Sequence, residues 1–552
     1  MSQNRSSRFM PLVVAFSVVL GILIGNFYAN HFSGNRLSII NNSNNKLNDL
    51  MHLIDDQYVD PVKMPELVEK SLPEILKQLD PHSKYITAKD VEESMQDLKG
   101  SFSGIGISFT IYKDTIRVIN VVKGGPSEEV GLKAGDRIVA IDGKTFVGKS
   151  VTNDEAMKKL KGAKDSKIRL SIKRVGAKNL LSFTIIRGDI PVKSIDTAYM
   201  LDKTTGYIRI NTFGDTTYPE LLAALAKLNH QGFKSLVIDL RGNGGGYMAP
   251  AIQMANEFLP KNSLILYTQG RKYPRENFRS DGRGTYQKIP LVVLVDETSA
   301  SASEIFTGAI QDNDRGTIIG RRTYGKGLVQ EPIEFPDGSM LRLTIARYYT
   351  PSGRCLQKPY TLGDEGNYDM DLYKRAEHGE YFSRDSIRTG GKKYYTRIGR
   401  TVYGGGGIIP DIFIARDSTG VTSYYQQALF SGMMFKFAFA YTDANRAKLE
   451  DFRDLPSLQT YLKEQDIPEQ FANYAEKNGL KRRNLMLKRS YQLFKTALTG
   501  YIIDDVLSKE AAIQYDNQTD PYILSALEVM NNGTAFPQKT QPVKQTDAKK
   551  GK

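Results

Sequence analysis

The segment KSLVIDLRGNGGGYMAPAIQMANEFL, from Lys234 to Leu259, constrains the fold because it joins a short apolar run, a glycine-rich turn and a helical pattern. Leu236 to Leu240 is bounded by turn residues, which is typical of a strand buried in a parallel sheet. Four glycines between Gly242 and Gly246 are more than one turn needs. Ligands bind at the carboxyl ends of such strands, and N–H groups in a glycine turn can form an oxyanion hole. The segment therefore predicts an α/β core with a functional site at this turn.

A second segment, Glu297 to Asn313 (ETSASASEIFTGAIQDN), offers a serine at the start of a predicted helix. Ser299, Ser301 or Ser303 could cap this helix, which continues through Ile310. Free backbone N–H groups and the helix dipole would favour developing negative charge at that end. Ser301 is the candidate nucleophile.

A third segment, Arg321 to Gln330 (RRTYGKGLVQ), places Lys326 between two glycines, and no histidine lies near it in the sequence. A serine hydroxyl needs a base that takes its proton, and a free lysine is protonated because its pKa is about 10.4. Burial among apolar groups lowers that pKa toward neutral. On a strand, Lys326, Leu328 and Gln330 would share one face, so Gln330 could orient the lysine without adding charge. We therefore expect Lys326 to act as the base.

Both segments have other interpretations. SASASE can be a plain helix-capping segment, and Lys326 can be a surface lysine. Gly320 to Gly327 (GRRTYGKG) also nearly matches the phosphate-binding loop GxxxxGK[ST]. However, glycine replaces the residue that should hold magnesium, and the following LVQEPIEF favours an extended chain over a helix. An NTPase is therefore a distant alternative.

The motifs DLRGNGGG, SASASEIF and YGKGLVQ, in this order, resemble those of the carboxyl-terminal processing (tail-specific) proteases. Further similar blocks are YVDPV, LDPHSKYI, ARYYTPSGRCLQ and GIIPDI, and together the blocks extend from about residue 45 to residue 415. The resemblance implies a PDZ-containing Ser–Lys peptidase whose core is similar to ClpP and crotonase. It implies Ser301 as the nucleophile, Lys326 as the general base and Gln330 as the orienting residue.

The resemblance also implies an oxyanion hole, formed by the backbone N–H of Ala302 and that of a glycine in the DLRGNGGG turn. Members of the family usually have proline where Gly244 stands, which leaves open whether Gly245 or its neighbour Gly244 donates. No cofactor is implied. The five histidines lack metal-ligand spacing, so no metal site is expected. A single cysteine, Cys355, forms no intramolecular disulfide and is interpreted as a structural thiol.

Residues 101–188 alternate like strands and carry several turn signals. The pattern GIGI followed by GPSEEVGLKAGDRIVAIDG resembles a PDZ domain. Such domains bind an extended peptide as an added strand and hold its terminal carboxylate on loop N–H groups. We therefore expect Gly104, Ile105, Gly106 and Ile107 to bind the free C-terminus of a protein or peptide substrate.

Near the N-terminus, Arg5 and Arg8 precede an apolar run from Met10 to Phe27. Its length, about 18 residues, is at the short end of what spans a bilayer. We expect residues 1–30 to be an uncleaved signal anchor, with a cleaved signal peptide as the alternative. Either way the remainder would be exported. The expected location is the bacterial cell envelope, with an inner-membrane anchor and the catalytic part in the periplasm.

The predicted fold class is α/β, in an α+β multidomain chain with an inserted PDZ domain. The predicted domains are residues 1–30 (anchor), 35–100 (helical cap), 101–188 (PDZ), 190–415 (peptidase core with an insertion at 360–400), 416–532 (helical) and 533–552 (disordered tail). The net charge of +14 is attributed to solvated faces and tails, so no nucleic acid partner is expected. A homo-oligomer or an adaptor protein stays open as a partner.

The leading hypothesis is a serine endopeptidase that recognises protein C-termini through its PDZ domain and cleaves or degrades envelope proteins. The alternative is a catalytically inactive PDZ scaffold that binds peptides. The presence of Ser301, Lys326 and Gln330 together favours the enzyme.

Overall fold

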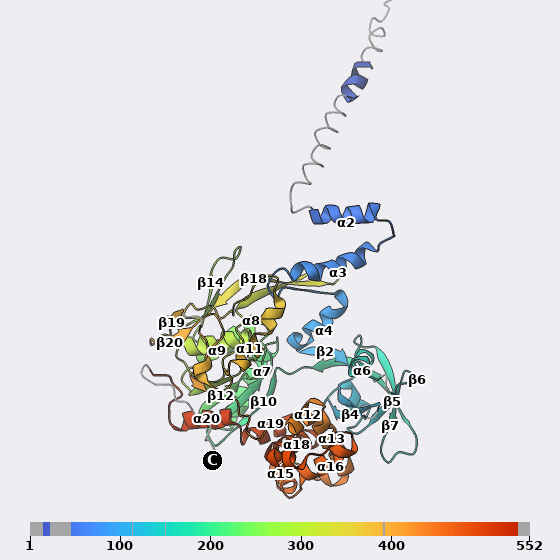
Figure 1. Cartoon of the computed structure of the whole chain (residues 1–552), viewed down its shortest axis with the longest axis vertical. Coiled ribbons are helices and arrows are strands. Elements are labelled where there is room, and N and C mark those ends of the chain that lie inside the picture. Colours follow the sequence, from blue (N-terminus) through green and yellow to red (C-terminus); the bar gives the residue numbers. More distant parts are fainter. Residues whose placement is uncertain (1–14, 23–45, 113, 149–150, 390–391, 539–552) are drawn as a thin grey trace, which may run out of the picture. The chain divides into compact units, whose positions relative to one another are not determined.

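The computed structural model describes residues 15–22, 46–112, 114–148, 151–389 and 392–538 (Figure 1). The chain forms two compact units, Met1–Leu79 and Asp80–Lys552. In the first unit, residues 15–22 are helical, and two longer helices follow, α2 (Lys46–Gln57) and α3 (Met64–Leu76). A proline in the first turn of α3 favours the start of that helix, because its missing N–H has no helical partner there in any case.

Among the ranges just given, no helix is both long enough and apolar enough to cross a membrane. The anchor predicted for residues 1–30 falls largely outside the described residues, which include only 15–22 of it. It stays a prediction, as does the disordered tail predicted for 533–552, of which 533–538 are described.

The second unit is built around a six-stranded sheet with the order β10-β11-β12-β15-β16-β21. Its strands run parallel except for the antiparallel pair of β10 and β11. The strands are β10 (Ile195–Met200), β11 (Thr205–Ile210), β12 (Ser235–Asp239), β15 (Leu291–Val295), β16 (Thr317–Gly320) and β21 (Ile412–Phe413). β12 and β15 are buried along their whole length. The strand expected at Leu236 to Leu240 is therefore central to the fold.

Helices cover both faces of this sheet. Three of them pack with their apolar sides on one face, namely α7 (Thr217–His230), α8 (Met248–Phe258) and α9 (Ala302–Asp312). The other face carries Val237, Val292 and Leu294, which pack against Ile523 and Val529 of α20 (Pro521–Asn531). A helix from the C-terminal region thus completes the core around this sheet.

A second, antiparallel sheet is organised by the long strand β18 (Met340–Tyr349), which pairs with three other strands. This sheet contains β1 (Lys84–Ile86), β13 (Leu264–Gln269), β14 (Glu276–Arg279) and β17 (Leu328–Glu334). Between this sheet and β21 the chain forms α10 (Glu365–Asp369), α11 (Asp371–Glu377), a short 3-10 turn (Arg384–Ser386), β19 (Lys393–Tyr395) and β20 (Thr401–Tyr403). The pairing of β1 with β18 brings the LDPHSKYI block close to β17.

The PDZ-like region has its own core under a sheet with the order β3-β4-β5-β7-β8. Its elements are β3 (Ile107–Tyr112), β4 (Thr115–Val121), α5 (Pro126–Glu129), β5 (Arg137–Ile141), β6 (Lys144–Thr145), α6 (Asn153–Leu160), β7 (Lys167–Lys173) and β8 (Leu181–Ile186). α4 (Ala88–Lys99) precedes it, and β2 (Ser101–Gly104) pairs with β9 (Gly188–Pro191) where the chain enters and leaves it. The region is therefore inserted between parts of the core.

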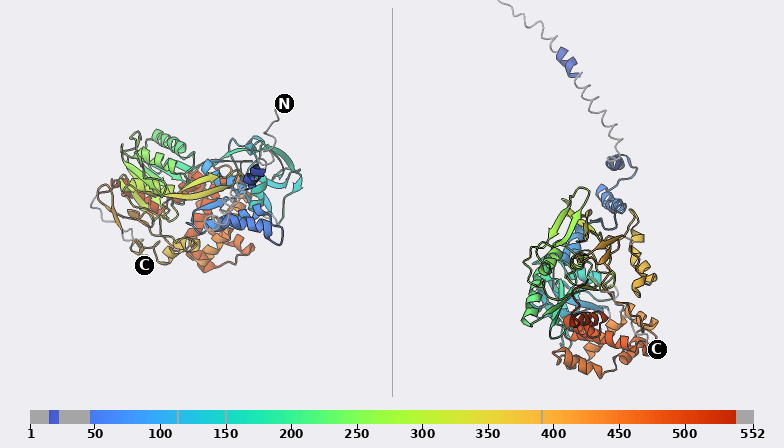
Figure 2. Two further views of the ribbon diagram at one scale, coloured as in Figure 1. Left: turned by 90° about the horizontal axis from the view of Figure 1, so that it is seen from above. Right: turned by 90° about the vertical axis from the view of Figure 1, so that its left-hand side faces the viewer.

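The C-terminal region is helical, as expected, and its helices gather into a bundle drawn in orange to red (Figure 2). The bundle consists of α12 (Ser423–Phe430), α13 (Met433–Ala444), α14 (Arg446–Leu449), α15 (Leu455–Lys463), α16 (Ile467–Lys477), α17 (Asn484–Arg489), α18 (Tyr491–Val506) and α19 (Lys509–Asn517). The last helix of the region, α20, packs on the six-stranded sheet instead. Phe437, Phe471 and Phe494 lie at the centre of the bundle core.

The bundle contacts the PDZ-like region through Arg117 of β4, whose side chain is only 3% exposed. Its guanidinium donates to Asp443 of α13 at 2.9 Å and lies 4.5 Å above the ring of Phe439. Arg446 packs against Gly135 of the PDZ-like region, at a position where any side chain would come within 4 Å of it. A buried, paired and stacked arginine thus joins the two regions.

Asp443→Ala should weaken this contact, because it removes the carboxylate that neutralises a buried guanidinium. We expect a loss of about 1–3 kcal/mol in the free energy of unfolding, less than for a fully buried pair because Asp443 is 26% exposed. Denaturant unfolding and protease cleavage around residues 101–190 would measure it. Glu450→Ala, which removes an exposed acid of the same bundle, is the control; equal behaviour of the two variants would contradict the prediction.

Candidate active site

Ser301 lies between β15 and α9, where the chain turns from a parallel strand into a helix. It is the residue before the first turn of α9, as the sequence predicted. Its φ of +55° is unusual for a residue with a side chain and costs free energy that the surrounding contacts must offset. This backbone conformation places the serine at the carboxyl edge of the sheet, beside the glycine turn that follows β12.

Glu304, one turn into α9, holds the serine and lysine segments together. Its Oε2 accepts the backbone N–H groups of Ser301 at 3.0 Å and Lys326 at 2.8 Å. Its Oε1 accepts the N–H of Gly325 at 2.8 Å and the hydroxyl of Thr323 at 2.5 Å. The side chain is completely buried, and this burial raises the pKa of Glu304 to about 7 against the effect of the four donors.

Sequence reasoning did not select Glu304. The signal was present, because a serine followed three residues later by glutamate is the pattern of a capping box. The contacts of Glu304 also weaken the NTPase alternative, since the N–H groups of Gly325 and Lys326 that would face a phosphate are bound to this carboxylate. The strand β17, rather than a helix, follows the loop.

Lys326 stands just before β17, in surroundings that disfavour its charge. Burial lowers the pKa of Lys326 to about 8, and the positive charge of Arg342 acts in the same direction. Its Nζ donates to Gln330 Oε1 at 2.9 Å. The expected alternation along one strand is wrong in detail, because β17 begins at Leu328 and its register shifts between Val329 and Gln330. The predicted contact between the lysine and the glutamine is nevertheless formed.

Gln330 is held in turn by the segment around His82. Its Nε2 donates to the backbone carbonyl of His82. Burial and the charge of Lys326 lower the pKa of His82 to about 3, so its ring is neutral at physiological pH. The ring nitrogen Nε2 lies 2.9 Å from the hydroxyl of Tyr368, which belongs to the insertion predicted at 360–400. His82 therefore supports the site through its backbone and carries no charge there.

Tyr348 of β18 makes a second link between the two segments, because its hydroxyl bonds to the carbonyl of Ser301 at 3.3 Å and to that of Lys326. In the described part of the chain, the Ser301 hydroxyl and the Lys326 amine do not form a hydrogen bond with each other. Catalytic contacts often tighten only when substrate binds. The structure thus brings the predicted serine, lysine and glutamine into one site without closing the serine–lysine contact.

The glycine turn lies against the serine at Gly245. A Cβ added to Gly245 would lie 2.7 Å from Ser301 Cβ and 2.9 Å from the nitrogen of Ala302, and φ at Gly245 is +101°. Its N–H donates to Asn243 Oδ1 at 2.8 Å. Gly244 is exposed, with no atom within 4 Å of an added Cβ. For Gly244 and Ala302, no described residue accepts the backbone N–H.

The loop Gly104–Ile107 connects β2 to β3, and its residues are buried or half-buried. The carbonyls of Ile105 and Gly106 accept backbone N–H groups from Ser127 and Val122 at 3.1 and 2.9 Å. The N–H groups of Ile105 and Gly106 find no acceptor within the described ranges. β3 is the end strand of its sheet, so its outer edge can pair with an added peptide.

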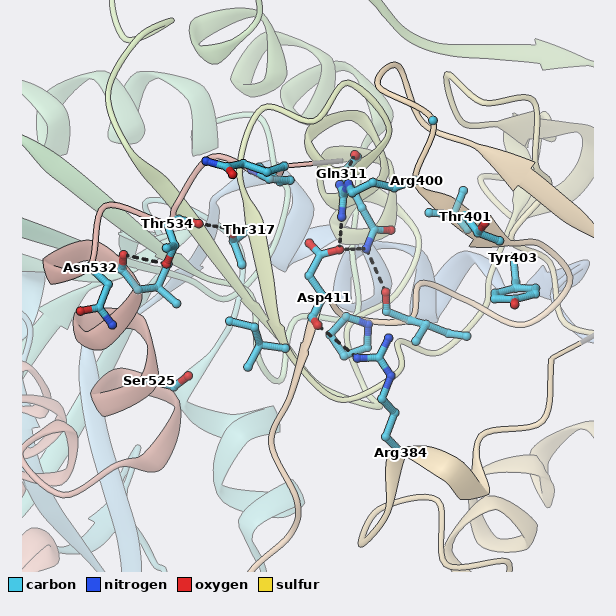
Figure 3. A pocket seen from close by; sticks show the side chains of 18 of the residues that line it. Gln311, Thr317, Arg384, Arg400, Thr401, Tyr403, Asp411, Ser525, Asn532 and Thr534 are labelled. Carbon is cyan, nitrogen blue, oxygen red and sulfur yellow. Dashed lines mark hydrogen bonds and ion pairs between the residues drawn. The ribbon is translucent and has the colours of Figure 1, made fainter. Parts of the chain in front are cut away.

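A cavity of about 580 Å³ lies elsewhere, between the C-terminal end of α9, the insertion and α20 (Figure 3). None of the predicted site residues lines it. Two of its arginines are already neutralised, Arg354 by Asp312 and Arg400 by Asp314 and Asp411. Across the described residues, no group of three or more His, Cys, Asp and Glu side chains could hold a metal ion.

Comparison with known proteins places this site in a family. The model of peptidase family S41 matches residues 204–365, a PDZ domain model matches 103–185, and a family of unknown function matches 424–508. A carboxy-terminal-processing protease of Bartonella bacilliformis is 36% identical over 318 residues, covering 56% of this chain and 72% of that protein. A carboxyl-terminal-processing protease of Synechocystis is 34% identical over 322 residues, covering 57% and 74%. Among solved structures, a photosystem II D1 C-terminal processing protease is 27% identical, covers 56% of this chain and 89% of that chain, and has a TM-score of 0.32.

The α/β core, the PDZ domain and these matches define a serine-type peptidase. The chain belongs to peptidase family S41, together with the carboxy-terminal processing proteases. The predicted family, fold class and enzyme class are thereby confirmed, and the comparisons give no support to an inactive scaffold. The roles of Ser301, Lys326 and Gln330 stay predictions.

Glu304→Gln should destabilise the protein, because an amide has one acceptor oxygen for four buried donors and brings an N–H₂ group toward them. We expect the free energy of unfolding to fall by about 2–5 kcal/mol near pH 8. The pKa of Glu304 is about 7 in the folded state, above the ordinary 4.5, so folded wild type takes up a proton and gains stability as the pH falls between these values. The difference in the free energy of unfolding between wild type and variant should therefore widen from pH 7 toward pH 5. Denaturant unfolding at several pH values measures this. Glu334→Gln, on exposed β17, is the control, and a pH-independent difference would contradict the reasoning.

Proposed function

We propose that Ser301 attacks the carbonyl carbon of a peptide bond while the neutral amine of Lys326 accepts the hydroxyl proton. Gln330 orients that amine, and the protonated lysine then gives its proton to the departing amine of the substrate. The observation that carries this proposal is the single buried carboxylate of Glu304, which binds the backbone of both Ser301 and Lys326. The lowered pKa of Lys326 supports its role as a base near neutral pH.

The oxyanion of the tetrahedral intermediate would be stabilised by the N–H groups of Ala302 and Gly245. Ala302 is the first residue of α9, so its N–H is free and the helix dipole favours negative charge there. The close approach of Gly245 to Ser301 favours it over Gly244 as the second donor. Its present bond to Asn243 would then be exchanged for a bond to the substrate oxygen.

We further propose that the substrates are proteins with free C-termini, which the PDZ domain holds while the core cleaves them. The free N–H groups of Ile105 and Gly106 support capture of a terminal carboxylate, and the open edge of β3 supports pairing with the peptide that precedes it. The names of the relatives, which are carboxy-terminal-processing proteases, agree with this substrate class.

The proposed location is the bacterial cell envelope, with residues 1–30 as an inner-membrane anchor and the catalytic part in the periplasm. Arg5 and Arg8 before the apolar run from Met10 to Phe27 support this location. Envelope proteins would then be the substrates. Fractionation of cells that express the full chain tests the location.

The rate of cleavage of an unfolded protein with an apolar C-terminus should rise with pH and level off above about 8, because Lys326 is a base only when neutral. Ser301→Ala and Lys326→Ala should each lower kcat/KM by roughly 10³-fold or more. Gln330→Glu should move the inflection to higher pH, because a carboxylate beside Nζ stabilises the ammonium. The measurement is kcat/KM for each variant between pH 6 and 10.

Two results would count against this mechanism. Cleavage that survives in Ser301→Ala would remove the serine from its role. A wild-type profile that keeps rising toward the ordinary lysine pKa of 10.5 would show that burial does not lower the pKa of the base. Glu334→Gln, which changes an exposed charge on the same strand, should leave the profile unchanged.

Gly244→Pro distinguishes the two glycines, because proline has no N–H to donate. Gly244 does not adopt a positive φ and has open space around it, so the substitution is sterically tolerable. If Gly245 is the donor, kcat should stay within a few-fold of wild type. A fall of roughly 10²-fold with unchanged stability would instead assign the donor role to Gly244. Single-turnover cleavage, compared with thermal unfolding of the same samples, gives the answer.

A further inference from the structure

The glycine turn is held from outside the peptidase core by a residue near the end of the chain. Arg241, the first residue of the turn, donates from Nη2 to Asp239 at 2.6 Å and from Nη1 to Asp520 Oδ2 at 2.6 Å. Its guanidinium also lies 4.5 Å above the ring of Tyr522. Asp239 belongs to β12, directly before the turn, whereas Asp520 lies 279 residues after Arg241 in the sequence. Neither the peptidase match nor the match to a family of unknown function includes Asp520.

The other contacts of the turn come from the core. Gly242 N–H lies 3.2 Å from both carboxylate oxygens of Asp296, and Asn243 Nδ2 donates to the carbonyl of Ile210 at 2.9 Å. The carbonyl of Gly245 accepts the N–H of Phe213 at 3.0 Å. The carbonyl of Asn243 also accepts the N–H of Ala300 and the hydroxyl of Ser303, both at 3.0 Å. These bonds tie residues 242–245 to the core, and the Arg241 side chain adds a contact at the beginning of the turn that reaches outside the core.

Two carboxylates on opposite sides define the position of the Arg241 side chain. Asp239 is completely buried and binds Arg241 through Nε and Nη2, so it draws the guanidinium back toward the strand. Asp520, 17% exposed, binds the remaining terminal nitrogen from α20. Charge-assisted bonds of this length are strong and directional. Loss of Asp520 would leave Nη1 without this carboxylate partner, and Asp239 alone would then set the position of the guanidinium and of the backbone that carries it.

We propose that Asp520, assisted by the ring of Tyr522, is a positioning residue for the oxyanion turn. It holds Arg241 in place so that Gly245 lies against Ser301, and it thereby makes the C-terminal region part of the catalytic machinery. This inference rests on the proposed function of Ser301 and of the glycine turn. A shift of a fraction of an ångström at an oxyanion donor is enough to slow the reaction.

Asp520 has a second role that the test has to separate. Its Oδ1 accepts the N–H of Tyr522 at 2.8 Å and so caps α20. Asn is as good a cap as Asp, so Asp520→Asn keeps the cap and removes the charge. Asp454 caps α15 in the same way, accepting the N–H of Ser457 at 2.9 Å, and does not contact the glycine turn. Asp454→Ala is therefore the matched control for loss of a helix cap.

The full chain is assayed with the same unfolded substrate and with a peptide aldehyde, which forms a tetrahedral adduct with a serine nucleophile. Asp520→Asn should lower kcat by about 10- to 100-fold with KM within about twofold. Its affinity for the aldehyde should fall by the same factor as kcat/KM. Asp454→Ala should keep wild-type kcat.

Wild-type kcat and aldehyde affinity in Asp520→Asn would overturn the proposal. The proposal would also be overturned if Asp520→Asn and Asp454→Ala lost kcat to the same extent and this loss matched the loss of folded protein seen in thermal unfolding. That result would assign Asp520 a merely structural role. A different result would contradict the proposed function, namely cleavage activity that persists in Ser301→Ala. An active wild type, an inactive Ser301→Ala and an unaffected Asp520→Asn would remove only the role of Asp520.

Discussion

The carboxylate of Glu304 is the contact on which the arrangement of this site depends. Ser301 and Lys326 are on different loops, and each loop has a backbone N–H group that needs an acceptor once it is buried. One side chain accepts from both loops and from Thr323, so the two loops cannot separate without leaving several buried groups unpaired. The unusual backbone of Ser301 persists because these bonds outweigh its cost.

The same carboxylate acts against the chemistry that it organises. A negative charge near Lys326 raises the pKa of the lysine, and Asp80 does so as well. Burial is the larger influence, and Arg342 adds to it, so the pKa nevertheless falls to about 8. Gln330 contributes orientation without charge, which explains why an amide serves at this position where a carboxylate would not. The pKa of Lys326 is therefore set by two opposing effects, and the desolvation of its ammonium outweighs its attraction to the nearby carboxylates.

Local patterns made much of this predictable from sequence. The strand before the glycine turn, the helix after Ser301 and the strands within residues 101–188 follow from short-range periodicity and turn residues. The PDZ domain was recognised by the resemblance of its GIGI and AGDRIVAIDG motifs. Glu304 was not selected as a site residue because an acidic side chain in the first turn of a helix is common. The anchor of Gln330 is a backbone carbonyl 248 residues away, and Arg241 meets an aspartate 279 residues away. Contacts at such separations depend on tertiary packing, and no local pattern encodes them.

The C-terminal region touches both working parts of the enzyme through the same kind of contact. Arg117 of the PDZ domain meets Asp443 of the bundle, and Arg241 of the glycine turn meets Asp520 at the start of α20. Each arginine also lies over an aromatic ring of that region. Arginine suits both places because its planar cation can stack and bond at once. A helical body that is fixed to the PDZ domain at one end and to the catalytic turn at the other gives the peptide-binding and peptide-cleaving parts a common frame. Peptide binding at the PDZ domain can be coupled to cleavage through this helical region only if one of the two arginine contacts adopts two discrete conformations.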